Sequence, residues 1–97
     1  MKLEKIKTYI GFAKKMGKLS YGQTVLKDLR KKSRLVIIDE GASDNTKDRF
    51  SVAAGNAGIK WIELPQGELA DAIGKPNVRV VCVKDQSLIR VILENLD

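Results

Sequence analysis

The sequence predicts an α/β fold, a three-layer α/β/α sandwich whose central mixed sheet has about four short strands. Helical patterns alternate along the chain with short runs rich in Val, Ile and Leu, as they do when helices cover both faces of a sheet. Two of these runs, LVII and VVCV, are continuously apolar, which is typical of strands buried on both faces. With 97 residues, we expect residues 1–97 to form a single domain.

The first third of the chain predicts two helices and one short connecting segment. Apolar side chains recur every three or four positions over residues 3–16, which predicts a helix that ends at Gly17. Residues 18–21 form either a brief strand or a turn. After Gly22, the spacing of apolar residues predicts a second helix over residues 23–32.

The middle of the chain predicts a buried strand followed by a helix. Residues 34–39 contain the LVII run and form the strand, and residues 40–45 form a polar loop. A third helix is expected over residues 44–57, with Ser43 or Asp44 as its N-cap.

The last third continues the alternation of strand and helix. We expect a strand over residues 60–64 and a short helix over residues 65–73, which has proline near its first turn. A further strand follows over residues 78–83. Asp85 then caps a final helix over residues 86–96, which carries a regular apolar stripe.

Positive charge is concentrated in the first third of the chain. The net charge is +6, and residues 1–34 hold eleven basic and two acidic residues, a local charge of +9, against −3 in residues 35–97. Such a surface attracts polyanions, and nucleic acid is the favoured one. Alternatively, the lysines only solvate exposed helix faces. An anionic membrane surface fits less well, because no basic helix has an aromatic or Leu-rich face to spare.

Composition removes several classes of function. The chain has one cysteine and no histidine, so it lacks an intramolecular disulfide, a zinc cage, and histidine-based triads or acid–base chemistry. No apolar run has the length of a transmembrane helix, and the charged N-terminus lacks the apolar core of a signal peptide. We therefore expect a soluble cytoplasmic protein that is not an enzyme and uses no cofactor.

Three features offer alternative chemistry. Asp39, Glu40 and Asp44 follow a strand end and could hold Mg²⁺ or act as a base, although turning the chain and capping the next helix explain them better. Cys82, between valines, fits a small buried hydrophobe better than a reactive thiol. Trp61 could stack on a base, but its place in a strand favours core or half-core packing.

The segment SYGQTVLKDLRKK contains the best candidate for ligand binding. Gly22 permits close backbone approach, and Gln23 and Thr24 offer donors and acceptors for base edges at a helix start. Basic residues that can reach phosphates follow along the same segment: Lys27, Arg30 and Lys31.

Nearly the whole chain resembles the kink-turn-binding ribosomal protein superfamily, which includes archaeal L-seven-Ae and eukaryotic L-thirty-e. The segments that carry the resemblance are GFAKKMGKLSYGQTVLKDLRKKSRLVIIDEGASDNTKDRF and GIKWIELPQGELADAIGK, and they are most similar to the short bacterial YlxQ-like members. The resemblance implies an α/β/α sandwich that binds kink-turns or related structured RNA, including ribosomal RNA, without catalysis. It also implies a partnership with the ribosome, and we expect a monomer.

The family's RNA-reading motif, Gly-x-Asn-Glu-x-x-Lys, falls on the same candidate segment. If Lys27 matches the motif lysine, Gln23 stands at the asparagine, Thr24 at the glutamate and Tyr21 at the glycine. If Gly22 matches the glycine instead, the chain is one residue short before Lys27. Gln23 keeps an amide but Thr24 lacks a carboxylate, so the departure bears on kink-turn specificity more than on RNA binding.

The resemblance implies further contacts in two loops. In the family, a loop before the last strand packs against a flipped-out base, and here it contains Asn77 and Val78. Alternatively, Val78 is the first inward residue of the strand. Glu40 lies in the loop after the first long strand, which the resemblance places near the RNA. The alternative function is a protein-interaction domain on the same scaffold, in which acidic residues of the later half, Glu63, Glu68 and Asp71, dock a basic partner.

Overall fold

One four-stranded sheet organises the fold in the computed structural model, which describes residues 1–97. The elements, in chain order, are α1 (Leu3–Lys15), β1 (Leu19–Tyr21), α2 (Gln23–Asp28), β2 (Leu35–Asp39), α3 (Asp44–Asn56), β3 (Lys60–Leu64), α4 (Glu68–Ile73), β4 (Val80–Val83) and α5 (Gln86–Glu94). The strand order is β1-β4-β2-β3, in which β2 and β3 run parallel and the other neighbours antiparallel. The predicted α/β/α sandwich with a mixed sheet is therefore confirmed.

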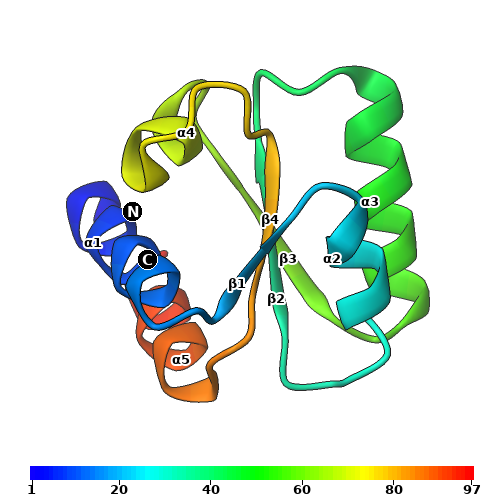
Figure 1. Ribbon diagram of the computed structural model, residues 1–97, viewed down its shortest axis with the longest axis horizontal. Helices are drawn as coiled ribbons and strands as arrows, with labels where there is room; N and C mark the ends of the chain where they lie inside the picture. Colours follow the sequence, from blue (N-terminus) through cyan, green and yellow to red (C-terminus); the bar gives the residue numbers. More distant parts are fainter.

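Helices cover both faces of the sheet. Figure 1 shows α1, α4 and α5 on one face and α2 and α3 on the other. Successive residues of β2 alternate between these layers, because side chains of a strand point to opposite faces. Leu35 and Ile37 join the cluster under α1, α4 and α5, whereas Val36 and Ile38 join the cluster under α2 and α3. All four side chains are fully buried, which explains the unbroken apolar run.

The second helix is shorter than its sequence pattern predicts. α2 ends at Asp28, not at residue 32, and Arg30 and Lys31 lie in the turns that follow it. Val25 and Leu29 are buried against the sheet, but no apolar residue follows until Leu35. Another helical turn would therefore have nothing to bury, and its basic side chains would repel one another.

Two other elements begin later than predicted. α4 begins at Glu68 because Gly67 adopts the left-handed conformation (φ 85°), and its N–H donates to Asp39 Oδ1 at 2.8 Å. β4 begins at Val80, so Val78 lies in the preceding loop. The two predicted caps are present: Ser43 Oγ accepts from the N–H of Thr46 at 3.2 Å, and Asp85 from that of Leu88 at 2.9 Å.

The structure decides two expectations, one about residues 18–21 and one about Trp61. The segment over residues 18–21 forms the strand β1, which pairs with β4. Trp61 does not belong to the core, because this side chain is 40% exposed. Trp61 lies on β3, an edge strand of the sheet, so it has a neighbouring strand on one side only.

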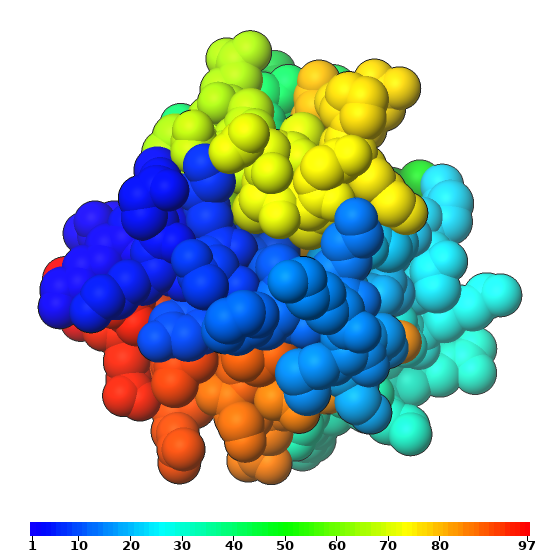
Figure 2. Space-filling view, turned by 60° about the vertical axis from the view of Figure 1, so that its left-hand side comes forward, coloured from blue at the N-terminus to red at the C-terminus, as the bar shows by residue number.

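The basic first helix and the acidic fourth helix lie against each other. Figure 2 shows α1 between α4 above it and α5 below it. Lys7 pairs with Glu68, with Nζ and Oε2 2.9 Å apart, and also with Asp71. Contact with Asp71 and then Glu68 raises the pKa of Lys7 above its ordinary value of 10.5. These ion pairs neutralise part of the charge that the sequence concentrates in its first third.

The longest helices, α1 and α3, have 13 residues each. No helix has both the length and the apolar character required to span a membrane.

Candidate functional site

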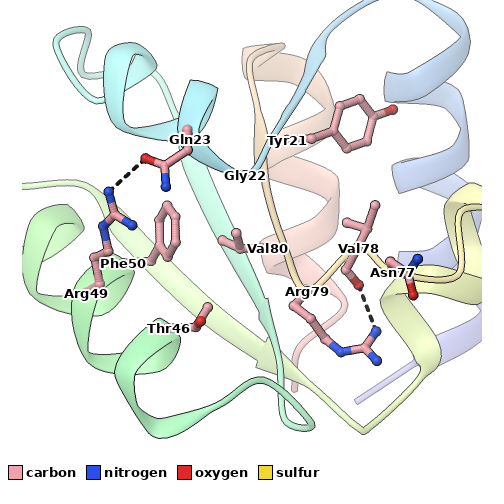
Figure 3. A pocket seen from close by; sticks show the side chains of 10 residues that line it. All are labelled: Tyr21, Gly22, Gln23, Thr46, Arg49, Phe50, Asn77, Val78, Arg79 and Val80. Carbon is pink, nitrogen blue, oxygen red and sulfur yellow. Dashed lines mark hydrogen bonds between the residues drawn. The ribbon is translucent and has the colours of Figure 1, made fainter.

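A cavity of about 400 Å³ opens where β1 ends and β4 begins. Three segments form its walls: the turn from β1 into α2, the first half of α3, and the loop between α4 and β4 (Figure 3). The lining residues are Tyr21, Gly22, Gln23, Thr46, Arg49, Phe50, Asn77, Val78, Arg79 and Val80. Segments that are distant in the sequence thus meet at one end of the sheet.

A sharp turn at Gly22 brings Gln23 to the rim of the cavity. Gly22 has φ 53° and ψ −129°, a conformation that strongly favours glycine because it has no Cβ. The chain can therefore pass directly from β1 into α2, and Gln23 becomes the first residue of the helix. Its side chain is exposed, and its Oε1 accepts a hydrogen bond from Arg49 Nη2 at 2.7 Å.

The wall contributed by α3 combines a cation with an aromatic ring. Thr46, Arg49 and Phe50 are spaced three and four residues apart, so they share one face of the helix. Phe50 is only 4% exposed and belongs to the core beneath α2 and α3. The guanidinium carbon of Arg49 lies 5.7 Å from the centre of the Phe50 ring, within range of a cation–π interaction.

The opposite wall is the loop that precedes β4. Val78 is half-buried and packs against the core, whereas Asn77 and Arg79 are exposed. Arg79 Nη1 donates to the carbonyl oxygens of Pro76 and Val78, both at 3.3 Å, so the side chain follows its own loop.

Tyr21 also lines the cavity, and its ring packs against the core beneath α1, α4 and α5. Lys75 Nζ lies 4.3 Å from the centre of the Tyr21 ring, which connects β1 to the loop before β4. Burial raises the pKa of the Tyr21 hydroxyl above its ordinary value of 10.0.

The lining favours an anionic or acceptor-rich ligand that has an apolar face. Both charged lining residues, Arg49 and Arg79, are cations, and none of the ten is acidic. Guanidinium groups bind phosphates and the acceptor atoms of bases. Phe50, Val78 and Val80 supply apolar surface beside them. A flat heteroaromatic group attached to a phosphate has both of the required properties.

Four of the residues proposed from the sequence line this cavity together: Gly22, Gln23, Asn77 and Val78. The other five lie outside the lining. Thr24 and Lys27 are exposed on α2, Arg30 and Lys31 are exposed in the turns after it, and Glu40 is exposed directly after β2. Since α2 has only six residues, the expected row of cations along a helix face reduces to Lys27.

Sequence reasoning did not identify the contribution of α3. Thr46, Arg49 and Phe50 were not among the candidates for the site. Their spacing of three and four residues on one helix face was the available signal. That spacing does not reveal that Arg49 meets Gln23, a residue 26 positions earlier.

Asp39, one of the three carboxylates considered for metal binding or base catalysis, has a structural role. This residue is fully buried, and its two oxygens accept hydrogen bonds from the N–H groups of Gly41 and Gly67, both at 2.8 Å. Asp39 therefore connects the loop that follows β2 to the loop between β3 and α4.

Cys82 is also buried, as predicted, and burial raises the pKa of its thiol to about 11.

No protein-family model matches the chain, and no curated protein matches it in sequence. Among solved structures, a Bacillus halodurans protein of unknown function is 26% identical, with a TM-score of 0.84 over 93% of this chain and 94% of that one. A Giardia lamblia 15.5 kDa RNA-binding protein is 20% identical, with a TM-score of 0.76 over 97% of this chain and 84% of that one. The chain therefore shares its fold with both proteins over nearly its whole length.

Proposed function

We propose that this chain is a non-catalytic RNA-binding protein that recognises a kink-turn or a related structured RNA. The observation that carries the proposal is the cavity at the start of α2, whose charged lining residues are both arginines and whose remaining lining includes apolar surface. An unpaired base in a structured RNA offers a ring face, acceptor atoms and a nearby phosphate. The cavity offers a complement to each of these three features.

Two further observations support an RNA ligand. The net charge of +6 favours association with a polyanion. The fold is also that of the Giardia lamblia RNA-binding protein. In the sequence, the segment similar to the kink-turn-binding motif contains Gly22 and Gln23, and both residues line the cavity.

In this proposal each wall of the cavity has a different task. Gln23 and Asn77 carry amides that can hydrogen-bond base edges, and Val78 offers an apolar contact to the face of a base. Lys27 lies one helical turn beyond Gln23 and is exposed, so it can neutralise a phosphate beside the cavity. In this proposal the protein acts as a monomer in the cytoplasm, in association with the ribosome.

The protein-interaction alternative relies on acidic residues that already have basic neighbours. Glu68 and Asp71 pair with Lys7 in the same chain. Glu63 Oε1 lies 3.9 Å from Lys47 Nζ. A basic partner would have to compete with these lysines for the carboxylates, so the RNA proposal is favoured.

A fluorescence titration tests the proposal directly. A labelled kink-turn RNA is compared with a duplex of equal length that lacks the internal loop, at about 50 mM and 200 mM salt. We expect selective binding to the kinked RNA, with affinity that falls as salt rises. Equal binding to both RNAs would contradict the recognition of structure, and absence of binding to either would overturn the proposal in favour of a protein partner.

A pair of arginine variants locates the site. Arg79→Ala removes a cation at the cavity, and Arg90→Ala removes one from α5, which packs on the opposite face of the sheet. Both changes alter the net charge equally. We expect Arg79→Ala to weaken binding by about tenfold more than Arg90→Ala, as a hydrogen bond to a charged group predicts. Equal effects would place the RNA elsewhere on the surface.

A further inference from the structure

A hydrogen bond joins the start of α2 to α3 across the rim of the cavity. Arg49 Nη2 donates to Gln23 Oε1 at 2.7 Å. A guanidinium carries donors and no acceptor, so the oxygen of the amide is the atom that must face it. The amide nitrogen of Gln23 therefore points away from Arg49. Figure 3 shows it directed toward the ring of Phe50, which also lines the cavity.

Arg49 is held in place from a second side. Its guanidinium carbon lies 5.7 Å from the centre of the Phe50 ring, and Phe50 is 4% exposed and fixed in the core. The helix that carries both residues is capped by Ser43. The donor that orients Gln23 is thus attached to a rigid part of the fold, whereas Gln23 stands at the beginning of a helix of only six residues.

We propose that Arg49 is a positioning residue that makes Gln23 a hydrogen-bond donor toward the RNA, so that the cavity selects acceptor atoms of a base. This inference rests on the proposed RNA-binding function and adds the polarity of the contact. A free glutamine amide can turn by half a rotation and present either its oxygen or its nitrogen. The bond from Arg49 fixes this choice: the oxygen stays turned toward Arg49, and the N–H donors of the amide are turned toward Phe50 and the lining of the cavity.

Arg79, the other charged residue of the cavity, also favours acceptor atoms of a ligand. It lies on the opposite wall and carries hydrogen-bond donors only, and no carboxylate lines the cavity to accept from a base amino group. The acceptor atoms that a purine exposes in a groove include N7 of guanine and adenine. A base that loses N7 should therefore lose affinity at this cavity.

The experiment measures a ratio of two affinities within each protein. One RNA is a kink-turn, and the other is the same kink-turn with 7-deazaguanosine, which lacks the N7 acceptor, in place of guanosine throughout its internal loop. The proteins are wild type, Arg49→Lys, which keeps a charged donor, and Arg49→Met, which keeps length but not the donor. Arg90→Ala serves as a control for a lost charge. Effects of the analogue on the RNA itself cancel when proteins are compared.

We expect wild type, Arg49→Lys and Arg90→Ala to bind the natural RNA about fivefold more tightly than the analogue, as one hydrogen bond predicts. For Arg49→Met the ratio should fall toward one. Because Arg49 is exposed, urea unfolding of Arg49→Met should match wild type. A lower ratio of the two RNA affinities in this variant then does not come from a loss of folded protein.

The outcomes distinguish the two proposals. If wild type binds the kinked RNA selectively but Arg49→Met keeps the full ratio, the role of Arg49 is overturned and RNA binding stands. A wild-type ratio of one likewise overturns the acceptor selectivity alone. If wild type does not prefer the kinked RNA to a plain duplex, the proposed function fails, and the role of Arg49 fails with it.

Discussion

Replacing Asp39 by asparagine should destabilise the protein more than any equivalent change at its surface. The carboxylate is fully buried, and each oxygen accepts one backbone N–H, from Gly41 and from Gly67, at 2.8 Å. Asparagine has nearly the same shape but replaces one oxygen by an NH₂ group. A donor would then face a backbone donor, and one buried N–H would lose its partner.

The magnitude follows from the bonds that change. A hydrogen bond to a charged group contributes about 1.5–3 kcal/mol, and the remaining bond to a neutral amide is weaker than the original. We therefore expect Asp39→Asn to lower the free energy of unfolding by about 2–3 kcal/mol. With a denaturant slope of about 1.5 kcal/mol per molar urea, the unfolding midpoint should fall by about 1–2 M.

Circular dichroism during urea unfolding measures this change. Asp48→Asn is the matched control, because it makes the same substitution at an exposed position of α3. The control should stay within about 0.5 kcal/mol of wild type. If both variants unfold at the same urea concentration, the two hydrogen bonds of Asp39 do not stabilise the fold, and the reasoning is refuted.

Three other predictions concern single side chains. Lys27→Ala should weaken RNA binding and flatten its salt dependence by about one phosphate contact, measured by titration at several salt concentrations; an unchanged slope would remove Lys27 from the interface. Burial raises the pKa of Cys82 to about 11, so iodoacetamide should label this thiol at neutral pH only after unfolding, and rapid labelling of the native protein would contradict its burial. Because Asp71 and Glu68 raise the pKa of Lys7, Lys7→Met should be less stable than wild type at neutral pH. That stabilisation is complete below the ordinary pKa of 10.5 and is lost as pH rises through the raised value, so a urea midpoint difference that did not shrink in alkali would refute it.

The sequence predicts the layers and strands of this protein well because burial leaves a strong pattern. β3 has the predicted bounds, Lys60–Leu64, and β2 begins one residue later than predicted. The runs LVII and VVCV mark β2 and β4, which helices cover on both faces, although β4 begins two residues later than predicted. The predicted second helix ran too far because residues 30–32 are basic residues with good helix propensity. In the structure α2 ends earlier, because further turns would have no apolar contacts and their basic side chains would repel one another.

The candidate site could be predicted only in part, for a physical reason. Gly22 and Gln23 were identifiable because glycine before a polar helix start has a local meaning. Asn77 and Val78 came from resemblance to a family. Arg49 contacts Gln23 only because α2 and α3 cover the same face of the sheet, so no local sequence pattern predicts the contact.

The position of β4 in the sheet has a consequence for how the chain acquires its structure during synthesis. β4 separates β1 from β2, although it is the last strand to leave the ribosome. Until Val83 has emerged, β1 lacks its neighbour in the sheet, and only β2 and β3 can pair. The pairing of β1 with β4 therefore joins segments about 60 residues apart, and such non-local closure slows folding. Nascent chains arrested before β4 should remain protease-sensitive around β1 and α2, and protection of this region should appear only when β4 completes the sheet.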